Sequence, residues 1–353
     1  MLRAAVIGCG RMGAEPSERF EGIIPPGWCP ISHTESFLQA KGVELVALAE
    51  TNLSRLEWVG SHYRVNSCFQ DYNNLFETIS PSIIGVATRT PEKISILQDA
   101  CKYGVRGAYV EKPLANSLLD SRNILDAATN ANMIISYGVN RRFHSLYRQA
   151  RSFIRAGEIG DLLEIVIEFG ESSLLWSHPH SVDLMIFLSE QRPLSVQAEL
   201  VGSSVNILSD ACIDSDPVVS YAQFWFDGGV RGLIGRGGGY SVRANGTIGS
   251  LEILSDGASI HIRKQNGPQK GYFLLHQTIF PVMHRSATVV AIEELVNNIN
   301  GESIESISHE EIYWGMQMLW GCAFSHLQHG RRCLLADIPN DLVITGRLGA
   351  MYA

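Results

Sequence analysis

The chain has few charged residues, no cluster of basic side chains and no long apolar run, and each absence excludes a class of protein. Lysine and arginine total 28 against 36 acidic residues, a formal net charge of −8. Nucleic-acid-binding surfaces are typically basic patches, so we expect no nucleic-acid partner. A membrane-spanning helix needs about 18 or more consecutive apolar residues. The sequence has no such run, and we expect no membrane partner.

Paired cysteines are also missing. The seven cysteines are scattered, odd in number and without a CxxC pair, which is typical of reduced thiols in a cytoplasmic protein. The apolar run at the N-terminus is short and leads directly into a glycine motif, which favours a first β-strand over a secretory signal. These observations predict a cytoplasmic protein.

Hydrophobic residues make up 45% of the 353 residues, more than a disordered chain contains. At roughly 150 residues per domain, this length suggests two domains. Residues 1–140 alternate short β-rich runs with segments of helical length, which predicts a doubly wound α/β domain whose parallel sheet is covered on both faces. The expected strands are 4–8, 43–49, 82–87, 107–110 and 133–136, and the expected helices are 53–63, 92–103 and 117–130.

Residues 141–353 are dominated by strand-like runs joined by glycine-containing turns. Consecutive strands with few helices between them predict an α+β domain with a mainly antiparallel sheet. The expected strands are 162–169, 195–201, 218–226, 230–234 and 250–254, and the expected helices are 145–156, 181–188, 287–299 and 310–329. No linker separates the halves, so we expect a packed interface between the two domains.

A glycine motif follows the first expected strand directly. The motif consists of Gly8, Cys9, Gly10, Arg11, Met12 and Gly13. In such a motif the first glycine allows a tight turn, the second lets backbone amides approach a pyrophosphate, and the third allows close packing of helix on strand. Its position at the start of a βαβ chain predicts binding of a dinucleotide.

An acidic residue usually follows such a motif by about 20 residues and binds the adenosine ribose. Here Glu50 ends the second strand, and the segment 14–32 accounts for the longer spacing. Its prolines, glycines and Trp28 predict an inserted surface loop near the cofactor or the cleft, either a simple excursion or a lid over the substrate. Glu50 favours NAD because a carboxylate repels the 2′-phosphate of NADP, although Arg55 keeps NADP open as an alternative.

A second motif, Tyr109-Val-Glu111-Lys112-Pro113, resembles the glucose–fructose oxidoreductase / inositol dehydrogenase / MocA (Gfo/Idh/MocA) family. Four further segments are similar to that family and occur in the same order along nearly the whole chain. They are Ala87-Thr-Arg-Thr90-Pro91-Glu, Ile154-Arg-Ala-Gly-Glu-Ile-Gly160, His180-Ser-Val-Asp183 and Asn245-Gly-Thr-Ile-Gly-Ser. The resemblance implies a Rossmann domain, a second domain with a large open sheet, and a homodimer or homotetramer.

The resemblance also implies roles for individual residues. Lys112 would be the main proton-handling group and His180 its partner, while Asp183, one turn further along the helix, would orient the His180 ring or bind a substrate hydroxyl. The residues implied to lie beside the cofactor, in addition to the glycine motif and Glu50, are Thr88, Thr90, Pro91 and Glu111.

The sequence departs from the family pattern at Trp176. Inositol dehydrogenase-like members carry an aspartate four residues before the active-site histidine, and this chain carries a tryptophan, which could stack on a sugar face. Trp176 is therefore a candidate for substrate contact. His178, two residues before His180, is a further candidate that the resemblance does not imply. Arg142, which follows the last strand of the first domain, could contact an anionic substrate or simply cap the sheet. The cysteines and histidines between Cys322 and Cys333 could suggest a zinc site, but a glycine interrupts their helix and we expect no metal.

The resulting hypothesis is an NAD(P)-dependent dehydrogenase or reductase. It would transfer a hydride between nicotinamide and a hydroxyl or carbonyl of a small molecule, most simply a sugar, cyclitol or nucleotide-sugar. Two alternatives stay open: a reductase of C=N or C=C bonds similar to imine or biliverdin reductases, and a non-catalytic NAD-sensing regulatory protein.

Overall fold

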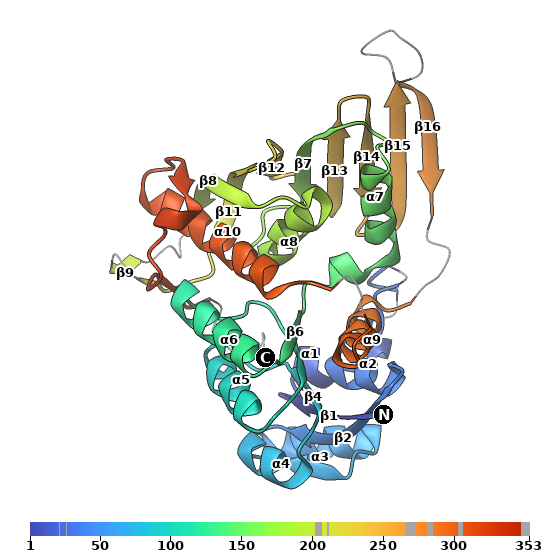
Figure 1. The fold of residues 1–353 in the computed structure, drawn as a ribbon, viewed down its shortest axis with the longest axis vertical. Coiled ribbons are helices and arrows are strands. Elements are labelled where there is room, and N and C mark those ends of the chain that lie inside the picture. Colours follow the sequence, from blue (N-terminus) through green and yellow to red (C-terminus); the bar gives the residue numbers. More distant parts are fainter. Residues whose placement is uncertain are drawn as a thin grey trace.

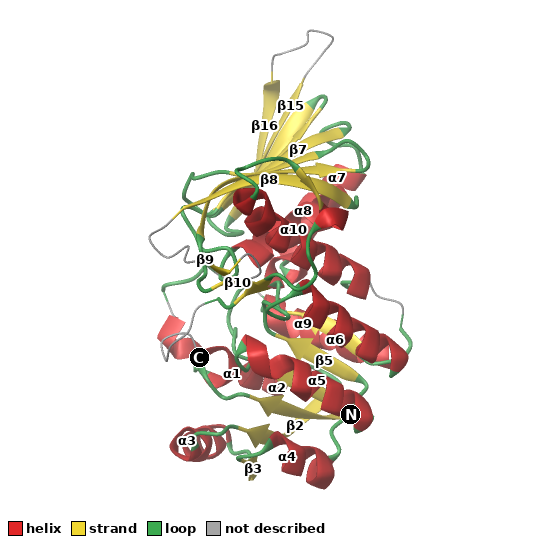
Figure 2. Cartoon of the chain, turned by 90° about the vertical axis from the view of Figure 1, so that its left-hand side faces the viewer, coloured by secondary structure: helices red, strands yellow, loops and turns green. Residues whose placement is uncertain are grey.

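Two large sheets lie at opposite ends of the molecule with helices between them (Figures 1 and 2). The computed structural model describes residues 1–20, 22–25, 27–201, 207–209, 212–265, 273–280, 285–302 and 306–346. Among these residues, no helix has the length and apolarity needed to cross a membrane.

The first sheet has six parallel strands in the order β3-β2-β1-β4-β5-β6. Its central strands are apolar and buried on both faces, as parallel sheets require. The strands are β1 Leu2–Ile7, β2 Val43–Ala49, β3 Ser67–Phe69, β4 Ile83–Val86, β5 Gly107–Val110 and β6 Ile134–Tyr137. The helices of this half are α1 Arg11–Ala14, α2 His33–Gln39, α3 Leu53–Tyr63, α4 Tyr72–Ile79, α5 Lys93–Lys102 and α6 Leu118–Asn130. The predicted doubly wound fold is confirmed.

The second sheet has nine strands in the order β16-β15-β14-β13-β7-β12-β11-β8-β17. Strands β7 and β12 pair in parallel and the other neighbours are antiparallel, which confirms a mainly antiparallel sheet. The strands are β7 Leu162–Glu168, β8 Pro193–Val201, β11 Val218–Phe226, β12 Arg231–Ile234, β13 Ser241–Gly246, β14 Gly249–Leu254, β15 Ser259–Gln265, β16 Phe273–Ile279 and β17 Cys333–Leu334. A small third sheet contains β9 Ile207–Ser209, β10 Cys212–Ile213 and β18 Val343–Ile344.

Helices cover one face of the nine-stranded sheet. These are α7 Ser145–Arg155, α8 His178–Ser189 and α10 His309–Leu327, which lie between this sheet and the first one (Figure 2). Along β8 buried and exposed side chains alternate, because one face packs on α10 and the other is open. Elements that the sequence analysis did not predict include β3, β13, β15, β16 and α4.

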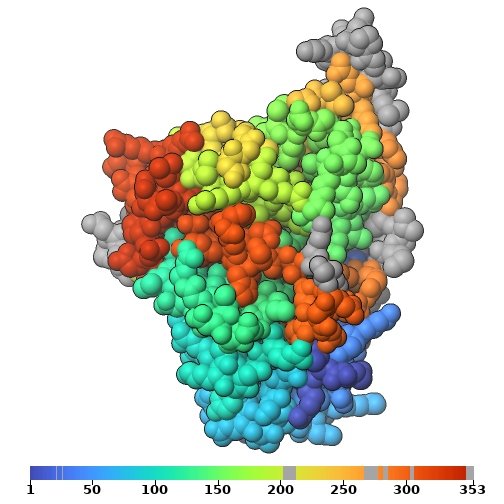
Figure 3. Space-filling view, viewed as in Figure 1, coloured from blue at the N-terminus to red at the C-terminus, as the bar shows by residue number. Residues whose placement is uncertain are grey.

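One helix of the second half returns to the first sheet. Helix α9, Ala287–Ile299, packs beside α2 against β5 and β6, where Arg106 Nη2 donates a hydrogen bond of 2.6 Å to the Ile299 carbonyl. Leu295 and Ile299 lie over Gly107, which has no side chain to hold them off. In Figure 3, orange residues of the second half lie directly against blue ones of the first. The predicted boundary between the two domains at residue 140 therefore stays a prediction, because α9 follows that boundary in sequence but packs on the first sheet.

Candidate active site

The glycine motif forms a turn that no other residue type could form. Gly8 has a φ of +88°, in the region that favours glycine. A Cβ on Gly13 would lie 1.9 Å from the Gly8 carbonyl oxygen, so β1 and α1 could not approach as they do. This turn borders a cavity of about 400 Å³ at the carboxyl ends of β1, β2 and β4. A dinucleotide pyrophosphate fits such a cradle of backbone amides.

Glu50 closes the far side of this cavity. Its carboxylate accepts hydrogen bonds from the backbone N–H groups of Cys9 at 2.8 Å and Asn52 at 3.0 Å. Arg55 donates to the Cys9 carbonyl at 2.8 Å and contacts Glu15 at 3.1 Å. A guanidinium engaged in this way is poorly placed to bind a 2′-phosphate, which supports the preference for NAD.

A second cavity, of about 320 Å³, continues from the first past Ala87 and Thr88. Arg11 and Met12 line it from the glycine turn, and Glu111 and Lys112 line it from the end of β5. The opposite wall comes from the second half of the chain and includes Arg141, Phe169, Trp176, Ser177, His180 and Tyr240. The folded chain thus brings both sequence motifs to one crevice, at the edge where the strand order reverses.

Lys112 lines this second cavity. Its Nζ donates a hydrogen bond of 2.6 Å to the Trp176 carbonyl and lies 4.1 Å from the centre of the Trp176 ring. Desolvation in this position lowers the pKa of Lys112 to about 8 despite the opposing charge of Glu111. The Lys112–Pro113 peptide bond is cis. A lysine with such a pKa can exchange a proton near neutral pH.

Two buried residues support the strand end that carries Lys112. His33 contacts the Glu111 carboxylate at 3.2 Å. Burial alone would raise the pKa of Glu111, but this hydrogen bond and the neighbouring lysines hold it below its ordinary value. Lys93 donates to the carbonyls of Glu111 and Pro113, the residues on either side of Lys112, and burial lowers its own pKa to about 7.

His180 faces the same cavity from α8. Burial lowers the pKa of its imidazole well below the ordinary value, and the charges of Arg141 and Lys112 lower it further. Among the described residues, its buried Nδ1 has no hydrogen-bond partner. The ring is therefore neutral and can exchange a hydrogen bond with a ligand in the cavity.

Comparison with known proteins agrees with this arrangement. A model of an oxidoreductase family with an NAD-binding Rossmann fold, GFO_IDH_MocA, matches residues 2–139. Residues 2–139 are thus similar to the NAD-binding Rossmann domain of this oxidoreductase family.

Curated relatives of this family are distant. The chain is 26% identical over 144 residues to a D-apiose dehydrogenase of Paraburkholderia graminis, covering 40% of this chain and 38% of that one. It is 24% identical over 161 residues to a myo-inositol 2-dehydrogenase of Thermotoga maritima, covering 45% and 42%. The matched part of the chain thus spans about two fifths of the length of these relatives.

Solved structures share the fold over nearly the whole chain. An inositol dehydrogenase homologue of Azotobacter vinelandii, solved with NADH and myo-inositol, superposes with a TM-score of 0.75 at 17% identity, covering 94% of this chain and 97% of that one. At this identity the likeness establishes the fold alone.

Two of the sequence-based assignments, those of Asp183 and Arg142, need correction. Asp183 does not orient His180: its carboxylate holds Arg142 through contacts of 2.6 to 3.1 Å, and both side chains are buried. Burial raises the pKa of Asp183 to about 6, and beside Arg142 the carboxylate still carries its charge at neutral pH. Arg142 does not line either cavity, and its neighbour Arg141 does. Consecutive residues of the 3₁₀ turn Asn140–Phe143 point in different directions, and the sequence alone could not tell which one faces the site.

The remaining candidates divide by position. Thr88 borders both cavities, whereas Thr90 and Pro91 border a smaller one of about 160 Å³ on the other side of Lys112. His178 is fully buried, contacts the Ser181 hydroxyl at 3.0 Å and lines none of these three cavities, so it is not placed to contact substrate. Within the described residues, no group of three or more potential ligand side chains could hold a metal.

The prediction of a surface loop at 14–32 is wrong for Trp28. This side chain is buried: it stacks on His144 at 4.9 Å, and its N–H donates to the Asp256 carbonyl at 3.0 Å. Ile31, near the end of the same segment, lines the second cavity. The sequence analysis did not identify Lys93 or His33 as site residues. The only indications of a role were that Lys93 closely follows the Thr90-Pro91 pair and that His33 begins α2.

Proposed function

We propose that the protein is an NAD-dependent dehydrogenase or reductase acting on a hydroxyl or carbonyl carbon of a sugar, cyclitol or nucleotide-sugar. The observation that carries the proposal is the Lys112 ammonium, whose pKa is lowered to about 8 in a cavity continuous with the glycine turn. The match of residues 2–139 to the family model and the sugar and inositol dehydrogenases among the relatives support the substrate class.

Each group in the cavity has a part in this proposal. Gly8, Gly10 and Gly13 would hold the pyrophosphate of NAD and Glu50 its adenosine ribose. Bound nicotinamide supplies the hydride acceptor or donor. Lys112 Nζ takes the hydroxyl proton as the carbinol carbon is oxidised and returns it in reduction. Neutral His180 holds the same substrate oxygen by a hydrogen bond, and Trp176 offers an apolar face to the ring.

Lys112→Met tests this proposal. Calorimetric titration with NAD and NADP measures cofactor binding, and a panel of sugars, cyclitols and nucleotide-sugars is followed by the absorbance of reduced nicotinamide. Removing a positioned proton carrier costs about 10²–10⁴-fold in rate, so we expect kcat to fall by that factor while the Kd for NAD is unchanged. Lys102→Met, on the exposed end of α5, is the matched control.

Other results would redirect the proposal. Binding of NAD without turnover across the panel would favour a reductase of C=N or C=C bonds, which Trp176 in place of the family aspartate leaves open, or a regulatory NAD sensor. Failure to bind either cofactor would overturn the proposal altogether. The homodimer or homotetramer expected from the family resemblance stays a prediction.

A further inference from the structure

Asp216 holds the chain segment that contacts Lys112. Its two carboxylate oxygens accept hydrogen bonds from consecutive backbone N–H groups, those of Leu175 at 2.7 Å and Trp176 at 3.1 Å. Neighbouring backbone contacts join the same two segments, including a hydrogen bond of 2.8 Å from Leu174 N–H to the Pro217 carbonyl. The stretch before α8 is thereby fixed to the start of β11.

Trp176 transmits this position to Lys112. The Trp176 backbone N–H donates a hydrogen bond to Asp216, and the Trp176 carbonyl accepts one from the Lys112 ammonium. The Trp176 indole ring also lies against this ammonium. Lys112, Trp176 and Asp216 all border the cavity of about 160 Å³, while Lys112 and Trp176 also border the larger cavity of the proposed reaction. One residue therefore separates the carboxylate from the ammonium.

Asp216 also balances the charge around Lys112. The cations near Lys112 are Arg11 and Arg141, with Lys93 behind the strand end, and neutral His180 lies close by. Two acids oppose them. Glu111 is one: its charge raises the pKa of Lys112 the most, and its carboxylate also contacts His33. Asp216 is the other, and its charge raises the pKa of Lys112 against the effects of burial and of the two arginines.

We propose that Asp216 is a positioning residue for Lys112, which holds the Trp176 main chain and ring against the ammonium and supplies a negative charge to the Lys112 site. The inference rests on the proposed role of Lys112 as the proton carrier. It assigns the carboxylate of the site to the segment just before β11 rather than to position 176, which carries an indole.

Asp216→Asn in the full-length protein tests the inference, because it keeps the side-chain shape while it removes the charge and one of the two hydrogen-bond acceptors. The readout is the pH dependence with which acetic anhydride labels Lys112, measured by mass spectrometry. Since an opposing charge nearby raises a lysine pKa by about one unit or more, we expect the labelling midpoint of Lys112 to move down by about one pH unit. Asp214→Asn is the matched control: this exposed carboxylate bonds the Thr345 hydroxyl at 2.9 Å, and its loss is expected to leave the midpoint in place.

Further variants keep the test decisive. If Asp216→Asn does not fold, Asp216→Ser, which retains one hydrogen-bond acceptor, is expected to show the same downward shift. Asp216→Glu keeps the charge and is expected to restore the midpoint. An unchanged or raised midpoint in a folded Asp216→Asn or Asp216→Ser variant would overturn the inference.

The labelling experiment needs no substrate, so it separates this inference from the proposed function. Absence of turnover in the wild-type protein would sink the function and leave the labelling result valid. Where turnover is found, the low-pH limb of kcat/KM for oxidation is expected to shift with the labelling midpoint. A purely structural role would instead lower activity at every pH without moving the limb.

Discussion

Single side chains in this site owe their chemistry to their surroundings. Lys112 and Lys93 are both lysines, and burial lowers the pKa of both side chains, yet they have different roles. The Lys93 amine donates its hydrogen bonds to the carbonyls of Glu111 and Pro113, whereas Lys112 lines the cavity. Position relative to the strand end, rather than pKa, therefore separates the supporting lysine from the proton carrier.

The lowered pKa of Lys112 predicts a pH profile. Oxidation needs the neutral amine as base, so kcat/KM for oxidation should rise with pH through about 8 and then level off. Reduction needs the ammonium as acid and should fall over the same range. Steady-state rates at saturating NAD or NADH measure both limbs. An oxidation limb that rises only near the ordinary lysine pKa of about 10.4 would show that Lys112 is not desolvated as described.

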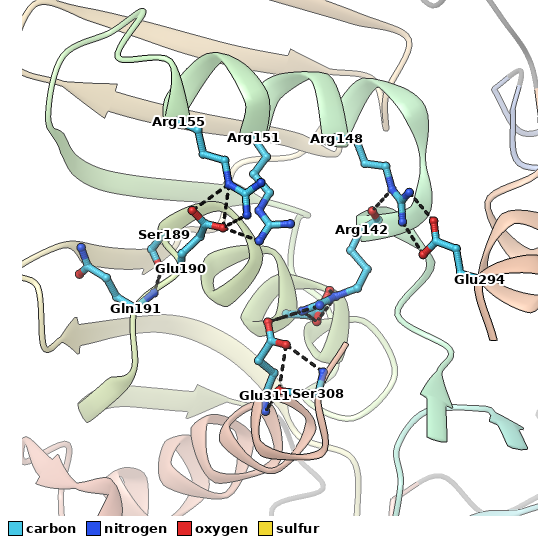
Figure 4. A network of polar contacts seen from close by, with 11 residues as sticks. Arg142, Arg148, Arg151, Arg155, Ser189, Glu190, Gln191, Glu294, Ser308 and Glu311 are labelled. Carbon is cyan, nitrogen blue, oxygen red and sulfur yellow. Dashed lines mark hydrogen bonds and ion pairs between the residues drawn. The ribbon is translucent and has the colours of Figure 1, made fainter. Parts of the chain in front are cut away.

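At the scale of elements, buried ion pairs join helices to the turn that follows β6. Arg142, in the 3₁₀ turn Asn140–Phe143, pairs with Asp183 of α8. It also approaches Glu311 of α10 at 3.4 Å (Figure 4). On α7, Arg148 reaches Glu294 of α9, while Arg151 and Arg155 reach Glu190 at the end of α8. The polar network thereby connects helices that pack on different sheets.

Asp183→Leu is expected to destabilise the fold strongly. It leaves the buried Arg142 guanidinium without its main partner, and breaking a buried pair in this way costs about 3–5 kcal/mol. The double variant Arg142→Met with Asp183→Leu removes both charges and should recover most of this loss. Urea unfolding measures the free energies. Glu171→Ala, which removes one partner of the exposed Arg236 pair, serves as control and should change stability by less than about 1 kcal/mol; equal losses in both cases would contradict the buried-pair interpretation.

At the scale of the whole molecule, segments far apart in sequence pack together in the region between the two sheets. Trp28, from the segment before α2, stacks on His144 and lies 5.4 Å from the Arg141 guanidinium. Arg141 in turn pairs with Asp256 through two contacts of 2.8 Å and lines the cavity of Lys112. Helix α9 adds a second connection in the opposite direction, from the second half of the chain to β5 and β6.

Trp28→Ala is expected to affect both stability and substrate binding. Trp28 is 7% exposed, and truncating a buried aromatic side chain costs about 3–5 kcal/mol. Arg141 lines the cavity, and in the variant its guanidinium loses the indole ring that packs beside it. KM should therefore rise more than kcat falls. Thermal unfolding and steady-state kinetics measure the two effects. Trp58→Ala is the control, since Trp58 is 40% exposed on α3 and its loss should cost about 1 kcal/mol or less; equal effects of the two variants would contradict a structural role for Trp28.

The sequence by itself determined the features that depend on local backbone geometry. The glycine turn is one, because the positive φ of Gly8 and the contact at Gly13 arise within six consecutive residues. The alternation of apolar strands and helices is another, because a sheet covered on both faces needs continuous apolar runs. Lys112 and His180 were identified through family motifs, and the fold brings both to one cavity.

Only the tertiary structure decided which side chains meet across the chain. Arg142 and Asp183 are 41 positions apart, and Trp28 and Asp256 are 228 apart. No local pattern selects such partners, since a buried charge or indole takes whichever complementary group the packing brings within reach. The same reason explains why Asp183 was expected beside His180, and why the contribution of Asp216 to the Lys112 site becomes visible only when β11 lies against the segment before α8.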